Sequence, residues 1–197
     1  RFIAEQDLKA ETRFVPKKIV PTLEGEFKEK IAIIGAGPAG LSCAFYLAEK
    51  GYYPTIFEKN EKPGGMLVYG VPSYKLEKDV VAAEIDIIKA MGVEIKTGVE
   101  VGKDITIDEL RKQGYKAFYV AIGCQGGKKA GVPGEDATGV TTAVDFLREV
   151  SEKESYNLEG DVVVIGGGNV AIDAARCGGR VGDYKVTMFC LEDKEHM

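Results

Sequence analysis

The fold is decided by residues 30–59, which read KIAIIGAGPAGLSCAFYLAEKGYYPTIFEK. The stretch opens with Ile31–Ile34, a β-branched run that is typical of a buried parallel strand. A glycine-rich turn follows, and then the apolar residues between Leu41 and Ala48 recur at the spacing of a helix. A second apolar run, Pro54–Phe57, closes the stretch. The pattern therefore predicts a complete strand–helix–strand unit of a doubly wound, parallel α/β fold.

The turn of this unit carries the motif GxGxxG, whose glycines are Gly35, Gly37 and Gly40. The first glycine permits the turn, the second lets the backbone approach a pyrophosphate, and the third allows close contact between helix and strand. The helix N-terminus then offers N–H groups and a positive dipole end to the phosphates. Glu58 follows at the end of the second strand, where the hydroxyls of a ribose need an acceptor. A glycine-rich turn that binds nothing is the weaker interpretation, because the expected context is complete.

Residues 161–192 repeat the pattern with the motif GGGNVA, a GxGxxA variant that starts at Gly166 and ends at Ala171. A strand over 162–165 precedes the motif, a helix over 169–180 follows, and a strand over 185–191 ends at Glu192. The two motifs are thus well separated along the chain, and each has its own strands and helix. Two dinucleotide motifs in one chain favour hydride exchange between a nicotinamide and a flavin, for which the protein mainly supplies orientation and electrostatics.

The rest of the chain is divided into a lead-in over 1–29, a first domain over 30–130 and the start of a second domain over 131–197. In chain order the pattern predicts a short helix near 3–9, a loop over 61–75 and a helix over 76–91, with Leu76, Val80, Ala83, Ile87 and Met91 on its buried side. It then predicts a strand over 93–96, a helix over 107–113, a buried strand over 117–122, a linker over 128–139 and a helix over 142–153.

Composition excludes several functions. The formal charge is −5, without a basic run, so neither nucleic acid nor an anionic membrane surface is an expected partner. No apolar run approaches the roughly 20 residues of a membrane span, and no signal peptide opens the chain, so we expect a cytoplasmic protein. Glycine is abundant, with 25 of 197 residues against a usual share of about 7%, and it is clustered rather than periodic.

The four cysteines are Cys43, Cys124, Cys177 and Cys190, which are widely spaced in the sequence. No CxxC or similar pair exists, which argues against a redox dithiol, a zinc site or an iron–sulfur cluster in this chain. We expect all four to be buried thiols. The missing cysteine pair also excludes a thioredoxin- or glutathione-reductase mechanism. His196 is the only histidine, so histidine-based catalysis is not expected.

Beyond the two motifs, the chain resembles the small subunit of glutamate synthase and its relatives, over essentially all of residues 1–192. These relatives include the electron-input half of dihydropyrimidine dehydrogenase and the NADPH-binding subunit of ferredoxin-linked transhydrogenases. The resemblance is carried by both glycine stretches and by PGGMLVYGVPSYKLEKDVV, GVEIKTGVEVGKDIT, AIGCQ, GVPGEDATGV and AVDFL. The segment from Gly64 to Pro72 is its most specific part.

The resemblance implies a flavoprotein that takes hydride from NAD(P)H onto FAD and passes electrons to a partner that holds iron–sulfur clusters. Carried onto this chain, the implied FAD-binding residues are Gly35, Gly37, Pro38, Ala39, Gly40, Glu58, Lys59, Gly65, Met66, Leu67, Lys75, Val101 and Gly123. The implied nicotinamide-dinucleotide residues are Gly166, Gly168, Asn169, Val170 and Ala171. Lys75 replaces an arginine that some relatives place near the flavin phosphates.

Three departures from the resemblance matter. Relatives that use NADPH have two basic residues after the second motif, where this chain has Leu191 and Glu192. A carboxylate repels a 2′-phosphate and accepts a hydrogen bond from a free 2′-hydroxyl, so we expect NADH to be preferred. The family usually carries its cysteine clusters upstream of the point where this sequence starts, and RFIAEQ resembles the sequence just after them, so we expect the clusters on a separate segment. The chain also ends inside the second domain, so we expect a fragment whose strands expose apolar faces. A nucleotide-binding or assembly module without turnover remains an alternative.

Overall fold

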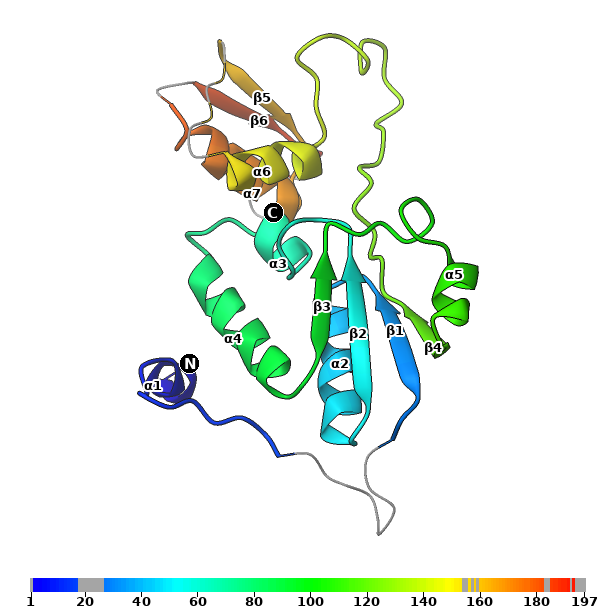
Figure 1. The fold of residues 1–197 in the computed structure, drawn as a ribbon. Coiled ribbons are helices and arrows are strands. Elements are labelled where there is room, and N and C mark those ends of the chain that lie inside the picture. Colours follow the sequence, from blue (N-terminus) through cyan, green and yellow to red (C-terminus); the bar gives the residue numbers. More distant parts are fainter. Residues whose placement is uncertain are drawn as a thin grey trace. The chain divides into compact units, whose positions relative to one another are not determined.

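The computed structural model describes residues 2–17, 27–153, 156, 158, 160–182, 185–191 and 193. The chain divides into two compact units. The first comprises Arg1–Val68 and Leu76–Gly123, and the second comprises Tyr69–Lys75 and Cys124–Met197. Each unit has its own sheet and its own core, and Figure 1 labels the elements of both.

The described part of the first unit contains a four-stranded sheet in the order β3-β2-β1-β4. All three pairings are parallel, with Ile31 opposite Pro54 on one side and opposite Ala117 on the other. The carboxyl ends of the strands therefore meet at one edge, where open α/β sheets bind their ligands. The strands are β1 (Lys30–Ile34), β2 (Tyr53–Glu58), β3 (Glu94–Thr97) and β4 (Tyr115–Val120).

The helices of this unit largely follow the sequence pattern. The helix predicted after the first glycine motif is α2, and Gly51 follows its end with a φ of 90°. The segment 61–75 was predicted to be a loop. It also contains the short helix α3. Gly64 and Gly65 start that helix, since their carbonyls accept from the N–H groups of Leu67 and Val68. The helices are α1 (Phe2–Leu8), α2 (Pro38–Glu49), α3 (Met66–Tyr69), α4 (Lys78–Ala90) and α5 (Ile107–Lys112).

Both faces of the sheet are covered at its central strands β1 and β2, which are apolar and buried along almost their whole length. Alternate residues of β1 point to opposite faces. Ile33 belongs to a core cluster with residues of α2 and α4, whereas Ala32 belongs to a second cluster with Leu110 of α5. Figure 1 shows these helices around the sheet. The packing fixes α2, and with it the glycine turn at its start.

Two sequence expectations about burial are wrong. Within α4 the buried positions are Val81 and Ile85, whereas Val80 and Ile87 of the predicted side are only half-buried. Met91, predicted on the same side, follows the helix and is buried in the core. Both faces carry apolar residues at helical spacing, and packing against α2 selects between them. The strand predicted as buried over 117–122 is β4, which lies at the edge of the sheet and leaves Val120 62% exposed.

The second unit contains β5 (Val162–Ile165) and β6 (Val186–Phe189), paired in parallel. Its helices α6 (Ala143–Glu152) and α7 (Asn169–Gly178) share a core cluster. Alternate residues of β5 are exposed, with Ile165 at 76%, and in β6 Phe189 is exposed. The predicted exposure of apolar strand faces is thereby confirmed.

Within the described residues, no helix has the length and hydropathy that crossing a bilayer requires.

All four cysteines are free thiols rather than disulfides. Cys177 is buried as expected, but Cys124 is exposed and the other two are half-buried, so uniform burial is wrong. Burial raises the pKa of the Cys177 thiol, which keeps it protonated and unreactive near neutral pH.

Substitution of Ile33 tests the core that fixes α2. Ile33 is 0% exposed, so Ile33→Ala should lower the free energy of unfolding by about 2–5 kcal/mol through lost burial and a residual cavity. Urea denaturation of the purified protein measures this change. Ile3→Ala is the matched control, because Ile3 is 83% exposed and its truncation should change stability by less than about 0.5 kcal/mol. Equal losses in the two variants would contradict the assigned core.

Candidate dinucleotide sites

The first glycine turn brings three backbone segments into contact. Gly35 has a φ of 104°, and a Cβ there would lie 2.4 Å from the carbonyl oxygen of Ala121. A Cβ on Gly40 would lie 1.9 Å from the carbonyl oxygen of Gly35. Helix α2 begins at Pro38 with Gly37 as its N-cap, and no side chain caps it. The uncapped first turn therefore presents backbone N–H groups at the carboxyl edge of the sheet, as binding of a pyrophosphate requires.

A second glycine loop packs against this turn. The N–H of Gly64 donates to the carbonyl of Ala36 at 2.8 Å, and a Cβ on Gly65 would lie 2.8 Å from the Cα of Gly37. Lys78 supports the loop from α4, because its Nζ donates to the carbonyl of Leu67 at 2.8 Å. Burial lowers the pKa of Lys78. Sequence patterns did not reveal this lysine, since its role depends on a tertiary contact.

Glu58 links the end of β2 to the glycine turn. Its side chain is almost fully buried, and its Oε2 accepts from the N–H of Ala36 at 2.7 Å. Its Oε1 accepts from the backbone N–H and the side-chain amide of Asn60, at 2.9 and 2.7 Å. A carboxylate oxygen accepts about two hydrogen bonds, so Oε2 keeps capacity for a ribose hydroxyl. The sequence analysis did not identify Asn60, although an asparagine so soon after a strand-end carboxylate could have suggested it.

The other predicted FAD residues differ in how the structure connects them to this turn. The N–H of Ala121 donates to the carbonyl of Ile34, which places the chain leading to Gly123 beside β1. The N–H of Val99 likewise donates to the carbonyl of Glu58, just before Val101. Lys59 is exposed, and Met66 and Leu67 are half-buried in α3. Lys75 belongs to the second unit, where it forms an ion pair with Asp173.

The second glycine turn repeats the geometry of the first. The N–H of Gly166 donates to the carbonyl of Phe189 at 2.8 Å, as that of Gly35 donates to Phe57 at the same distance. Helix α7 begins at Asn169, with Gly168 as an N-cap and no side-chain cap. Asn169 and Val170 are both exposed there.

The two turns differ at their third position. A Cβ on Gly166 would meet the Cβ of Ala171 at 3.5 Å, an ordinary contact. The second turn is therefore open enough for alanine, whereas Gly40 admits no side chain. Glu192, predicted to distinguish NADH from NADPH, lies outside the described residues.

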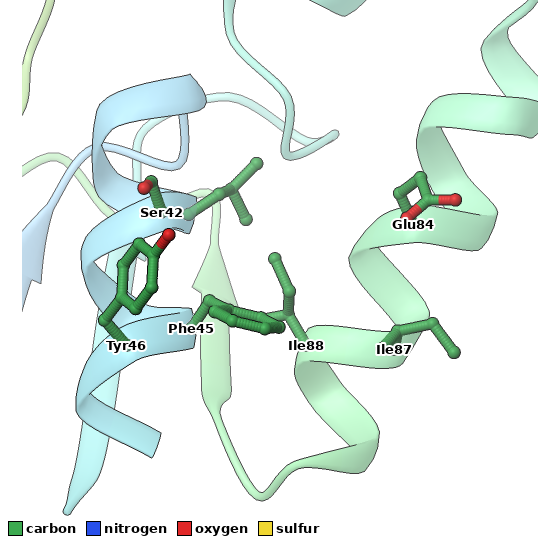
Figure 2. A pocket seen from close by; sticks show the side chains of 7 residues that line it. Ser42, Phe45, Tyr46, Glu84, Ile87 and Ile88 are labelled. Carbon is green, nitrogen blue, oxygen red and sulfur yellow. The ribbon is translucent and has the colours of Figure 1, made fainter. Parts of the chain in front are cut away.

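A groove of about 230 Å³ lies between α2 and α4 of the first unit. Figure 2 shows its side chains, with Phe45 and Ile88 turned toward each other and Glu84 at one border. Its lining is Leu41, Ser42, Phe45, Tyr46, Glu84, Ile87 and Ile88. These residues include none of the motif glycines. In the part of the chain that the structure describes, no three His, Cys, Asp or Glu side chains are grouped as metal ligands.

Comparison with known proteins identifies the family and the fold of the chain. The pattern that defines the pyridine nucleotide-disulphide oxidoreductases matches residues 29–194. The chain belongs to this family. A similar fold is found in FprA of Mycobacterium tuberculosis, whose complex with NADPH gives a TM-score of 0.65 at 28% identity, over 75% of this chain and 36% of FprA. The predicted Rossmann-like α/β class is thereby confirmed.

Curated relatives narrow the resemblance within the family. The chain is 46% identical over 172 residues to the NADP(+)-dependent formate dehydrogenase subunit beta of Moorella thermoacetica. It is 38% identical over 180 residues to the glutamate synthase [NADPH] small chain of Escherichia coli (strain K12). Each match covers 86% of this chain, but the chain spans only 24% and 38% of the two relatives. The resemblance to glutamate synthase small subunits is confirmed.

Gly40→Ala tests the first turn. The added methyl group would meet a backbone carbonyl rather than a flexible side chain, so the motif must shift at a cost of about 1–3 kcal/mol or more. We expect a lower melting temperature, measured by circular dichroism. Gly126→Ala is the matched control, because a Cβ at Gly126 meets nothing within 4 Å and its φ is not positive. An unchanged melting temperature for Gly40→Ala would contradict the described geometry.

Proposed function

We propose that this chain forms the electron-input part of a flavoprotein oxidoreductase, similar to the glutamate synthase small subunit. It takes hydride from NAD(P)H onto FAD, and the electrons then pass to a partner. The observation that carries the proposal is the pair of equivalent glycine turns, each at the carboxyl end of a parallel strand and each opening an uncapped helix. One chain thereby offers two pyrophosphate-binding sites, as transfer between two dinucleotides requires.

The first turn is the proposed FAD site, because it has the buried acceptor that a ribose requires. Glu58 is held by Ala36 of the turn itself, so the ribose acceptor and the pyrophosphate donors form one rigid group. When bound, FAD supplies the acceptor for a hydride, which is two electrons and one proton. The proposed contacts are Gly35, Gly37, Pro38, Ala39, Gly40, Glu58, Lys59, Gly65, Met66, Leu67, Lys75, Val101 and Gly123.

The second turn is the proposed nicotinamide-dinucleotide site, with contacts from Gly166, Gly168, Asn169, Val170 and Ala171. Glu192 follows it in sequence and would accept from a free 2′-hydroxyl, which favours NADH over NADPH. The two curated relatives carry NADP(+) or NADPH in their names, so this preference would distinguish the present chain from them.

The proposed electron acceptor is a partner subunit or domain with iron–sulfur clusters, and this chain itself is proposed to hold none. The wide spacing of its four cysteines, without a local pair, supports that division. We also propose a cytoplasmic location. An assembly module without turnover, or the input part of a pyrimidine reductase or transhydrogenase, is the competing function. Hydride transfer to a bound flavin distinguishes the assembly module from the others.

Anaerobic addition of NADH tests the proposed function. The purified protein should be yellow, and NADH should bleach the visible absorption band of its flavin. Reduction should also follow addition of NADPH, at lower affinity. A protein that binds both nucleotides without bleaching would support the assembly module instead, and a protein that binds no flavin would contradict the proposed FAD site.

Substitution of Glu192 tests the nucleotide preference. Glu192→Ala should strengthen NADPH binding roughly tenfold and weaken NADH binding, because it removes a like charge from the 2′-phosphate and an acceptor from the 2′-hydroxyl. Calorimetric titration measures both affinities. Asp161→Ala is the matched control, since Asp161 is an exposed carboxylate at the opposite end of β5. Tighter binding of NADPH than of NADH by the unsubstituted protein would overturn the preference.

A further inference from the structure

The two carboxylate oxygens of Glu58 are held unequally by the surrounding chain. Oε2 accepts one hydrogen bond, from the N–H of Ala36 at 2.7 Å. Oε1 accepts two, both from Asn60, whose backbone N–H lies at 2.9 Å and whose side-chain amide nitrogen lies at 2.7 Å. Among the residues that the structure describes, these three N–H groups are the donors to this carboxylate.

This division limits what the carboxylate can still accept. An ionised carboxylate has about four acceptor positions, two on each oxygen. Asn60 occupies both positions of Oε1, and Ala36 occupies one position of Oε2. A single position is left, on the oxygen that faces the glycine turn. The adenosine ribose of FAD carries two neighbouring hydroxyls, at its 2′ and 3′ carbons, and only one of them can donate to that position.

The backbone of Asn60 is fixed by the strand next to β2. The N–H of Gly98, directly after β3, donates to the carbonyl of Asn60 at 3.1 Å. The N–H of Val99 donates in the same way to the carbonyl of Glu58 at 2.9 Å. Glu58 is only 4% exposed and Asn60 is half-buried, so water has little access to replace the amide. Hydrogen bonds shielded from water in this way are strong and well defined in direction.

We propose that Asn60 determines the specificity of the flavin site, because it restricts Glu58 to one hydroxyl of the adenosine ribose. The inference rests on the proposed function, which assigns FAD to the first glycine turn. Asn60 acts through Glu58 and is therefore a positioning residue. A carboxylate with one open position distinguishes between the two hydroxyls, whereas a carboxylate with open positions on both oxygens accepts from both.

A purely structural role of Asn60 is the competing explanation. In that case the amide only stabilises the turn that follows β2, as asparagine side chains often do. Loss of such a contact weakens the binding of every flavin by the same factor, because the contact is independent of the ribose hydroxyls. The ratio of affinities for two flavins that differ in one hydroxyl therefore separates the two roles.

The test is titration of the flavin-free protein with FAD and with two FAD analogues, which lack either the 2′- or the 3′-hydroxyl of the adenosine ribose. Flavin fluorescence gives a Kd for each compound. Asn60→Ala removes the side-chain amide and keeps the backbone N–H, so it opens one acceptor position on Oε1. Gln113→Ala is the matched control, because it removes an exposed amide at the opposite end of the same sheet, before β4. Melting temperatures verify that each variant is folded.

We expect the unsubstituted protein to bind one analogue about tenfold or more weakly than FAD, and the other about as tightly as FAD. In Asn60→Ala both analogues should bind more weakly than FAD by similar factors, because both hydroxyls then find an acceptor. The ratio of the two analogue affinities should therefore fall toward unity. Gln113→Ala should keep the ratio of the unsubstituted protein.

Equal weakening of the two analogues in the unsubstituted protein would overturn the inference, since Glu58 would then accept from both hydroxyls. Binding of both analogues as tightly as FAD would overturn it as well, while FAD binding itself would stand. An unchanged ratio in Asn60→Ala would leave Asn60 with a structural role only and overturn its assignment. The comparison of the analogues in the unsubstituted protein decides the test if Asn60→Ala does not fold. A protein that binds no FAD would overturn the proposed function together with the inference.

Discussion

The structure depends on one backbone contact that leaves no room for a side chain. A Cβ on Gly40 would lie 1.9 Å from the carbonyl oxygen of Gly35, so α2 can approach β1 this closely only because Gly40 has no side chain. That approach buries Ile33 beneath α2 and directs the start of the helix to the carboxyl edge of the sheet. It also places the N–H of Ala36 on the carboxylate of Glu58. Core packing and the proposed binding of a dinucleotide thus have a common origin.

The second unit uses the same construction with a looser constraint. The N–H of Gly166 contacts the next strand as that of Gly35 does, but Ala171 takes the position of Gly40. The second turn therefore closes less tightly, and one apolar face of its two strands is exposed, with Ile165 at the carboxyl end of β5. A tight site and a more open one agree with the proposed roles, a retained flavin and a nicotinamide dinucleotide that enters and leaves.

Sequence reasoning identified the parts of the molecule that follow local rules. The β1–α2–β2 unit and the helix after GGGNVA could be predicted because strand and helix periodicity agree with the glycine chemistry there. Features set by tertiary contacts could not be predicted in this way. The choice of Ile85 over Ile87 on the buried side of α4 depends on packing against α2. The partner of Lys75 is Asp173, which lies in the other half of the sequence, and no local pattern connects two residues that far apart.

The central claim is that one chain holds two distinct dinucleotide sites, a flavin at the first glycine turn and a nicotinamide at the second. Hydrogen exchange followed by mass spectrometry tests it most directly, since bound phosphates protect the backbone N–H groups that they accept from. The account predicts that FAD slows exchange in the peptides around residues 35–41 and 64–68, and that NADH slows exchange around residues 166–172. Protection of the same peptides by both nucleotides, or of neither glycine turn by either one, would contradict it.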